Sequence, residues 1–249
     1  MPDRPPDAAP PAPHVVLLGD SIFDNEAYVG SDPCVTVQLR EALRHADPPW
    51  AEGRVALLAV DGARTEDVAR QIATIPADAT HLVLSSGGND ALSVAGLLTE
   101  EFTPQPGLFT RLAEVQERFH KHYSGLLERL ARTGRPVLVC TIYDACPGMG
   151  RHFLRPTADP IEPAVRAEID RHVGRVIRTM LSIFNDVIVR QATRQRMPVV
   201  ELRDLLTEPE DFSDLSPIEP SARGGQKLAD ALVATLAGRA SSPGRAGRG

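Results

Sequence analysis

The 249-residue chain is poor in aromatic residues, cysteines and long apolar runs, and each shortage argues against a class of protein. Aromatic residues make up only 4% of it, so no stacking platform for a glycan or a nucleobase is evident. No apolar run approaches the roughly 18 residues that a membrane span needs. The formal net charge is -6 and no block of lysine or arginine lies in the body of the chain. Nucleic acids and anionic membranes are therefore disfavoured as partners.

Residues 1–13 contain neither a cationic start nor an apolar core, so they do not have the pattern of a signal peptide. The chain has three cysteines, Cys34, Cys140 and Cys146. Without an export signal we expect them to be free thiols, with a Cys140–Cys146 disulfide as the alternative. These features predict a cytoplasmic protein, and they leave the oligomeric state open.

Both ends of the chain have the composition of disordered segments, with six prolines in residues 1–13 and little to bury in residues 239–249. One domain is expected between them, over residues 14–238. Short runs rich in valine, leucine and isoleucine predict five strands, at Val15–Leu18, Val55–Val60, His81–Ser85, Pro136–Ile142 and Pro198–Leu202. Strands that are apolar on both faces are typical of a parallel sheet covered by helices on both sides.

The segments between the strands have helical periodicity and end signals, at Cys34–Arg44, Thr65–Ala73, Leu112–Thr133, Pro163–Gln195 and Gly224–Leu236. The long segment is expected to be one helix, or two joined by a kink near Gly174. Alternating strands and helices predict a three-layer α/β/α sandwich with a five-stranded parallel sheet. Ligands of such folds bind beyond the carboxyl ends of the strands, so the chemistry is expected in the loops that follow them.

The first strand leads directly into Gly19-Asp20-Ser21-Ile22. This places the Ser21 hydroxyl at the carboxyl end of the strand. Asp20 and Ser21 are also residues that begin helices, so helix N-terminal N–H groups are expected near the serine. Such groups would favour an oxyanion that develops beside it. A turn or helix cap with no catalytic role is the alternative.

The third strand ends in Ser85-Ser86-Gly87-Gly88-Asn89-Asp90, at the same edge of the sheet. The glycines allow the backbone to approach a ligand closely, and Asn89 can offer a side-chain N–H. Gly62, in the loop after the second strand, could supply a further backbone N–H. A helix start capped by asparagine or aspartate is the alternative interpretation of the third-strand motif.

In their order and positions these motifs resemble those of the SGNH, or GDSL-like, hydrolase superfamily, over about residues 14–237. The resemblance implies a flavodoxin-like sheet order and hydrolysis or transfer of acyl groups on small esters, lipids, thioesters or acylated sugars. It implies that Ser21 is the nucleophile and that its N–H, Gly62 and Asn89 form an oxyanion hole, supported by Asp20, Gly88 and Asp90. It implies no metal or organic cofactor.

The last motif of the family, Asp-x-x-His before the final helix, is altered in this chain. The corresponding stretch is Ser216-Pro217-Ile218-Glu219-Pro220-Ser221, so that Ser216 occupies the aspartate position and Glu219 the histidine position. A glutamate has an ordinary pKa about two units below that of histidine and is the weaker base. The start of a helix would lower its pKa further, whereas burial near Asp20 would raise it.

His152, in the loop after the fourth strand, is the one histidine expected at the functional edge, and it is the candidate substitute base. Three functions follow from these observations. The first is a serine esterase that uses Ser21 with Glu219 as an unusual base. The second is a weak or inactive member that binds a ligand in the inherited pocket, and the third is an acyltransferase.

Overall fold

The computed structural model describes residues 12–47, 50–94, 107–148 and 163–238. The segments predicted to be disordered lie almost wholly outside these residues, and so does His152. Within the described part, Cys34, Cys140 and Cys146 are free thiols, as expected. No helix in the described ranges is long and apolar enough to cross a membrane. The predicted cytoplasmic location is not tested by these observations.

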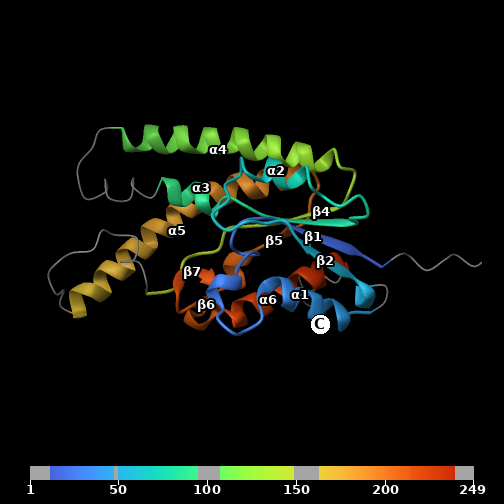
Figure 1. The fold of residues 1–249 in the computed structure, drawn as a ribbon. Coiled ribbons are helices and arrows are strands. Elements are labelled where there is room, and N and C mark those ends of the chain that lie inside the picture. The colour runs from blue at the N-terminus through green and yellow to red at the C-terminus, as the bar shows by residue number, and fades with distance from the viewer. Residues whose placement is uncertain (1–11, 48–49, 95–106, 149–162, 239–249) are drawn as a thin grey trace, which may run out of the picture.

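Five parallel strands form the central sheet in the order β2-β1-β3-β4-β5 (Figure 1). This is the flavodoxin-like order, and the predicted α/β class is confirmed. The two outer strands β2 and β5 and the inner strand β4 are shorter than predicted. Their bounds, with those of the other two, are β1 (His14–Gly19), β2 (Arg54–Leu57), β3 (His81–Ser85), β4 (Val137–Cys140) and β5 (Val199–Val200).

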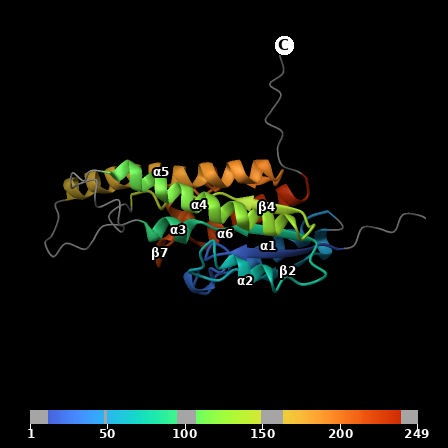
Figure 2. The same ribbon diagram turned by 90° about the horizontal axis from the view of Figure 1, so that it is seen from above.

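Helices cover both faces of the sheet (Figures 1 and 2). On one face α1 (Val35–Arg44) packs against α6 (Ala222–Leu236). On the other face lie α2 (Val68–Ile72), α3 (Gly88–Ser93), α4 (Leu108–Ala131) and α5 (Pro163–Arg194). The helix α5 continues through Gly174, so the first of the two predicted alternatives is correct. Short 3-10 helices occupy Glu26–Tyr28, Trp50–Glu52, Leu202–Asp204 and Pro209–Asp211.

Alternate residues of β1 contribute to two separate hydrophobic cores. Val16 and Leu18 belong to the core that includes α4 and α5, whereas Val15 and Leu17 belong to the core that includes α1 and α6. All four side chains are fully buried. Because the strand is covered on both faces, its apolar residues are continuous rather than alternating, and this is the pattern that the sequence displays.

The segment before α6 differs from the prediction. No strand was predicted there, but it forms an antiparallel hairpin of β6 (Phe212–Ser213) and β7 (Ser216–Pro220). Phe212 pairs with Pro220, and Ser213 pairs with Ser216. The strands are too short to show a recognisable hydrophobic period, which explains why the sequence did not indicate them.

Gly19 is expected to be indispensable to the end of β1. Its φ is +128°, and a Cβ atom there would lie 1.6 Å from the carbonyl oxygen of Ser85 on the neighbouring strand. We predict that Gly19→Ala lowers the free energy of unfolding by at least about 2–3 kcal/mol, through overpacking and backbone strain. Urea denaturation measures the loss. Gly125→Ala, in open space on α4, is the control and should be neutral or mildly stabilising; equal stability of the two variants would contradict the prediction.

Candidate active site

The register of the sheet brings the two predicted motifs together. β1 and β3 are adjacent, and Gly19 is paired with Ser85 at their carboxyl ends. Ser21 follows the first strand and Gly88-Asn89 follows the other, and all three residues line one pocket. The prediction that the chemistry lies beyond the strand ends therefore has a structural counterpart at this edge.

The chain turns sharply at Ser21. The N–H groups of Phe23 and Asp24 donate to the carbonyl oxygen of Asp20, at 3.2 and 3.3 Å, and close the turn. The α-helix expected to start here is not present, because between Ser21 and α1 the chain forms this turn and a short 3-10 helix. The prediction that a helix begins at Ser21 is therefore wrong, because the chain forms a turn there.

The end of β1 is held by a side chain that the sequence did not single out. The amide of Gln71, from α2, accepts a hydrogen bond from the Gly19 N–H at 2.7 Å and donates one to the Gly19 carbonyl at 2.8 Å. Gln71 is buried, so both of its bonds are shielded from water. This bidentate contact fixes the backbone two residues before Ser21. A glutamine on a helix gives no signal of such a role.

Asn89 and Asp90 connect α3 to the loop after β2. The Asn89 amide donates to the carbonyl oxygen of Ala63 at 3.0 Å, and the Asp90 carboxylate accepts from both the N–H and the hydroxyl of Thr65, each at 2.9 Å. The cap of α3 is Gly87, so neither side chain has the capping role that was the alternative. Gly62 lies in the same loop with φ +77°, and it is not among the described residues that line the pocket.

Glu219 reaches Ser21 from the far end of the chain. The Ser21 hydroxyl donates to Oε1 of Glu219 at 2.9 Å, and both side chains are buried. Oε2 of the same carboxylate is buried without a hydrogen-bond partner in the described part of the chain. Ser216 begins β7 and pairs with Ser213 in the hairpin, and it is not among the described residues that line the pocket.

Burial changes the protonation of the carboxyl groups in this pocket. It raises the pKa of Glu219 to about 7, with the hydrogen bond from Ser21 opposing the rise and the charge of Asp61 adding to it. Burial also raises the pKa of Asp20 to about 8, although the Ile22 N–H opposes this. The carboxyl beside Ser21 thus has a proton affinity close to that of an ordinary histidine.

The remaining wall of the pocket is mostly apolar, and its volume is about 80 Å³. The helix α5 contributes Ile177, Met180 and Leu181. Its polar lining residues include Asp20, Ser21, Ser85, Asn89 and Glu219. A small hydrophobic space with a few convergent polar groups is the usual form of a ligand site.

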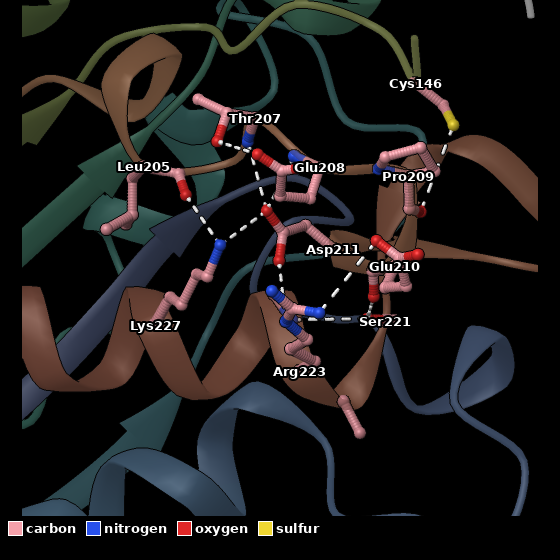
Figure 3. Close-up of polar contacts among 12 residues, drawn as sticks. Cys146, Leu205, Thr207, Glu208, Pro209, Glu210, Asp211, Ser221, Arg223 and Lys227 are labelled. Atoms are coloured by element: carbon pink, nitrogen blue, oxygen red, sulfur yellow. Dashed lines mark hydrogen bonds and ion pairs between the residues drawn. The ribbon is translucent and has the colours of Figure 1, made fainter. Parts of the chain in front are cut away.

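An ion-pair network supports the hairpin that carries Glu219 (Figure 3). The Asp211 side chain is fully buried, and it lies between Lys227, at 2.6 Å, and Arg223, at 3.4 Å. It also accepts hydrogen bonds from the N–H groups of Thr207 and Glu208. Burial alone would raise the pKa of Asp211, but the bonds from Lys227 and the two N–H groups outweigh it and lower the pKa.

The backbone of Asp211 joins this network to the site. Its carbonyl accepts from the Ser221 N–H at 2.9 Å, two residues after Glu219. A Cβ on Gly224 would lie 2.1 Å from that same carbonyl oxygen, so the first turn of α6 packs directly on it. The Tyr143 hydroxyl donates to the carbonyl of Ile218 from the other side. The position of Glu219 is therefore fixed from both sides by contacts that the sequence did not indicate.

The fold is an α/β/α sandwich, and one pocket at the carboxyl edge of its sheet is lined by Ser21 and Glu219. The chain belongs to the GDSL-like lipase/acylhydrolase family, whose model matches residues 17–227. None of the curated proteins matches it in sequence.

Solved structures of low sequence identity share the fold. The lipase/acylhydrolase from Enterococcus faecalis is 17% identical, with a TM-score of 0.61 over 94% of this chain and 100% of that one. The extracellular lipase from Streptomyces rimosus is 17% identical, with a TM-score of 0.60 over 90% and 99%. An acetyl xylan esterase variant from Geobacillus stearothermophilus is 14% identical, with a TM-score of 0.53 over 90% and 94%.

We predict that Asp211→Asn destabilises the protein by about 1–3 kcal/mol at neutral pH, because it weakens buried charge-assisted hydrogen bonds. The folded-state pKa of Asp211 is lowered, so its contribution is present above the unfolded-state pKa and is lost as pH falls through the folded value. The difference between variant and wild type should therefore shrink toward acidic pH. Urea unfolding at a series of pH values measures this. Asp214→Asn, on an exposed residue of the same hairpin, is the control; a pH-independent difference would contradict the expected linkage.

Proposed function

We propose that the protein hydrolyses esters of short apolar acyl groups, with Ser21 as nucleophile and Glu219 as general base. The observation that carries this proposal is the 2.9 Å hydrogen bond from the Ser21 hydroxyl to the Glu219 carboxylate, between two residues that line the pocket. A serine needs a base within hydrogen-bond reach to become a nucleophile. Here the carboxylate takes the place that a histidine has in related enzymes.

The raised pKa of Glu219 supports this assignment. A base is most effective when its pKa is near the working pH, and burial brings the pKa of Glu219 to about 7. Above that pH the carboxylate is ionised and can accept the hydroxyl proton. Below it the carboxyl is protonated and the serine has no base.

The reaction follows in two balanced steps. Ser21 Oγ attacks the acyl carbon as its proton passes to Glu219, and Glu219 returns the proton to the departing alkoxide, which leaves as the alcohol. Water then attacks the acyl-serine and gives a proton to Glu219, which returns it to Ser21 as the carboxylic acid leaves. The unpartnered Oε2 of Glu219 offers a second acceptor for that water. The Ser21 N–H and one N–H of Asn89 are the proposed donors to the oxyanion.

The size and lining of the pocket support the substrate class. Its volume of about 80 Å³ is roughly half that of an engineered apolar cavity that accommodates benzene. Aliphatic side chains from α3, α5 and the loop after β4 line it. A short acyl chain fits these walls better than a sugar, which would need more polar partners.

The first test is covalent labelling of the serine. We expect a fluorophosphonate probe to modify wild-type protein at Ser21 and to leave Ser21→Ala unlabelled, with mass spectrometry locating the adduct. The same pair should differ by at least about 10³-fold in hydrolysis of short-chain nitrophenyl esters. Labelling at another serine, or none in folded protein at pH 8, would count against the nucleophile and favour the ligand-binding alternative. An ester product formed with added alcohols would favour the transferase.

The second test is the role of Glu219. Glu219→Gln keeps the size and a hydrogen-bonding group but cannot accept the proton, so we predict a loss of about 10²–10⁴-fold in kcat/KM. In wild type, kcat/KM should rise with pH through a midpoint near 7 as Glu219 ionises. Glu26→Gln, on an exposed 3-10 helix, is the matched control. Unchanged rates in Glu219→Gln would remove this residue from the mechanism.

A further inference from the structure

The proposed oxyanion hole of this chain has fewer donors at the pocket than its family resemblance implies. Gly62 does not line the pocket among the described residues, and one side-chain N–H of Asn89 is directed to the Ala63 carbonyl. The Ser21 N–H and the other Asn89 N–H remain. A third donor is therefore sought among the polar groups that do line the pocket.

Asp20 is a buried carboxyl that lines the pocket and has no part in the mechanism described so far. Its Oδ1 accepts a long hydrogen bond, 3.5 Å, from the Ile22 N–H. Its Oδ2 faces Gly88, where a Cβ atom would lie 3.8 Å away. Because Gly88 has no side chain, no side-chain atom from that position covers Oδ2 of Asp20.

From this geometry we propose that Asp20, as a neutral carboxylic acid, donates a hydrogen bond from Oδ2 to the carbonyl oxygen of the ester and to the oxyanion that develops from it. The inference rests on the proposed function, because it assigns a further donor to the same reaction. The proton stays on Asp20 throughout, so the balance of the two chemical steps is unchanged. An ionised Asp20 would instead repel the oxyanion.

The surroundings of Asp20 favour its neutral form. Its pKa is raised to about 8; burial is the largest cause of the rise, and the carboxylates of Glu219 on β7 and Asp90 on α3 contribute to it. The other titratable groups that interact with it electrostatically are themselves kept neutral, because burial raises the pKa of each; they are Tyr123 on α4, Cys140 on β4 and Tyr143 after β4. A carboxylic acid held neutral in an apolar site is an established form of oxyanion donor.

Two carboxyl groups then set opposite limits on activity. Glu219 must be ionised, so activity rises as pH passes through about 7. Asp20 must be protonated, so activity falls as pH passes through about 8. The pH profile of kcat/KM should therefore be a narrow bell.

The test compares Asp20→Asn with Asp20→Ala in ester hydrolysis across pH. The asparagine keeps a neutral donor that does not titrate, so its kcat/KM at pH 7 should stay within about threefold of wild type and the fall above pH 8 should disappear. The alanine has no donor, and we expect a loss of about 10²–10³-fold in kcat. Glu41→Gln, an exposed carboxyl on α1, should leave both limbs unchanged.

A second readout needs neither activity nor the alanine variant. The infrared spectrum of wild type at pH 7 should contain the carbonyl stretch of a protonated carboxylic acid that Asp20→Asn lacks, and the band should vanish as pH rises through about 8. Its absence at pH 7 overturns the role of Asp20. An alkaline limb retained in Asp20→Asn also overturns it while leaving Ser21 and Glu219 in place. If no variant, wild type included, hydrolyses any ester, the proposed function and the role of Asp20 fail together.

Discussion

The site depends on one hydrogen bond, between the hydroxyl of Ser21 and the carboxylate of Glu219, whose residues are 198 positions apart in the chain. A contact of such sequence separation forms only when the whole sheet and the final hairpin are assembled. Each partner is accordingly held by a separate set of bonds. Gln71 fixes the end of β1 before Ser21, and the buried Asp211 fixes the hairpin that carries Glu219.

The burial of Ser21 and Glu219 determines what this hydrogen bond can do. In water a glutamate would be ionised and weakly basic, and a serine beside it would stay a simple alcohol. Aliphatic side chains from α5 and from the loop after β4 line the pocket around these two residues. Desolvation then raises the proton affinity of both Glu219 and Asp20. The same apolar walls that raise these pKa values are also the ones that would accommodate the acyl group of the proposed substrate.

The fold could be predicted from the sequence because strands buried on both faces give a strong and simple signal. Runs such as Val15–Leu18 contribute to two cores at once, and no polar residue interrupts them. The position of Ser21 followed from the same reasoning, since a residue just after a central parallel strand must lie at the carboxyl edge of the sheet. The family resemblance then placed Glu219 beside it, and the structure brings the two together.

The features that escaped prediction are those in which a polar side chain meets a backbone group far away in the sequence. Gln71 forms hydrogen bonds with the backbone of Gly19, and Tyr143 forms one with the carbonyl of Ile218. The sequence around Gln71 or Tyr143 does not indicate either contact. The hairpin of β6 and β7 is too short for periodicity, and the turn after Ser21 competes with a helix start that uses the same residue types. Such contacts can be found only in the three-dimensional structure. They determine the orientation of the proposed oxyanion donors and of the proposed base.

The changes at Ser216 and Glu219 can be understood as one electrostatic change. A histidine base becomes positively charged when it takes the serine proton, so an aspartate beside it stabilises the step. A glutamate base becomes neutral when it takes the proton, so no positive charge develops on it and no anionic partner is needed to stabilise one. An aspartate at position 216 would place another negative charge on the strand that carries Glu219 and raise the pKa of Glu219 further. A serine at position 216 adds no charge to that strand.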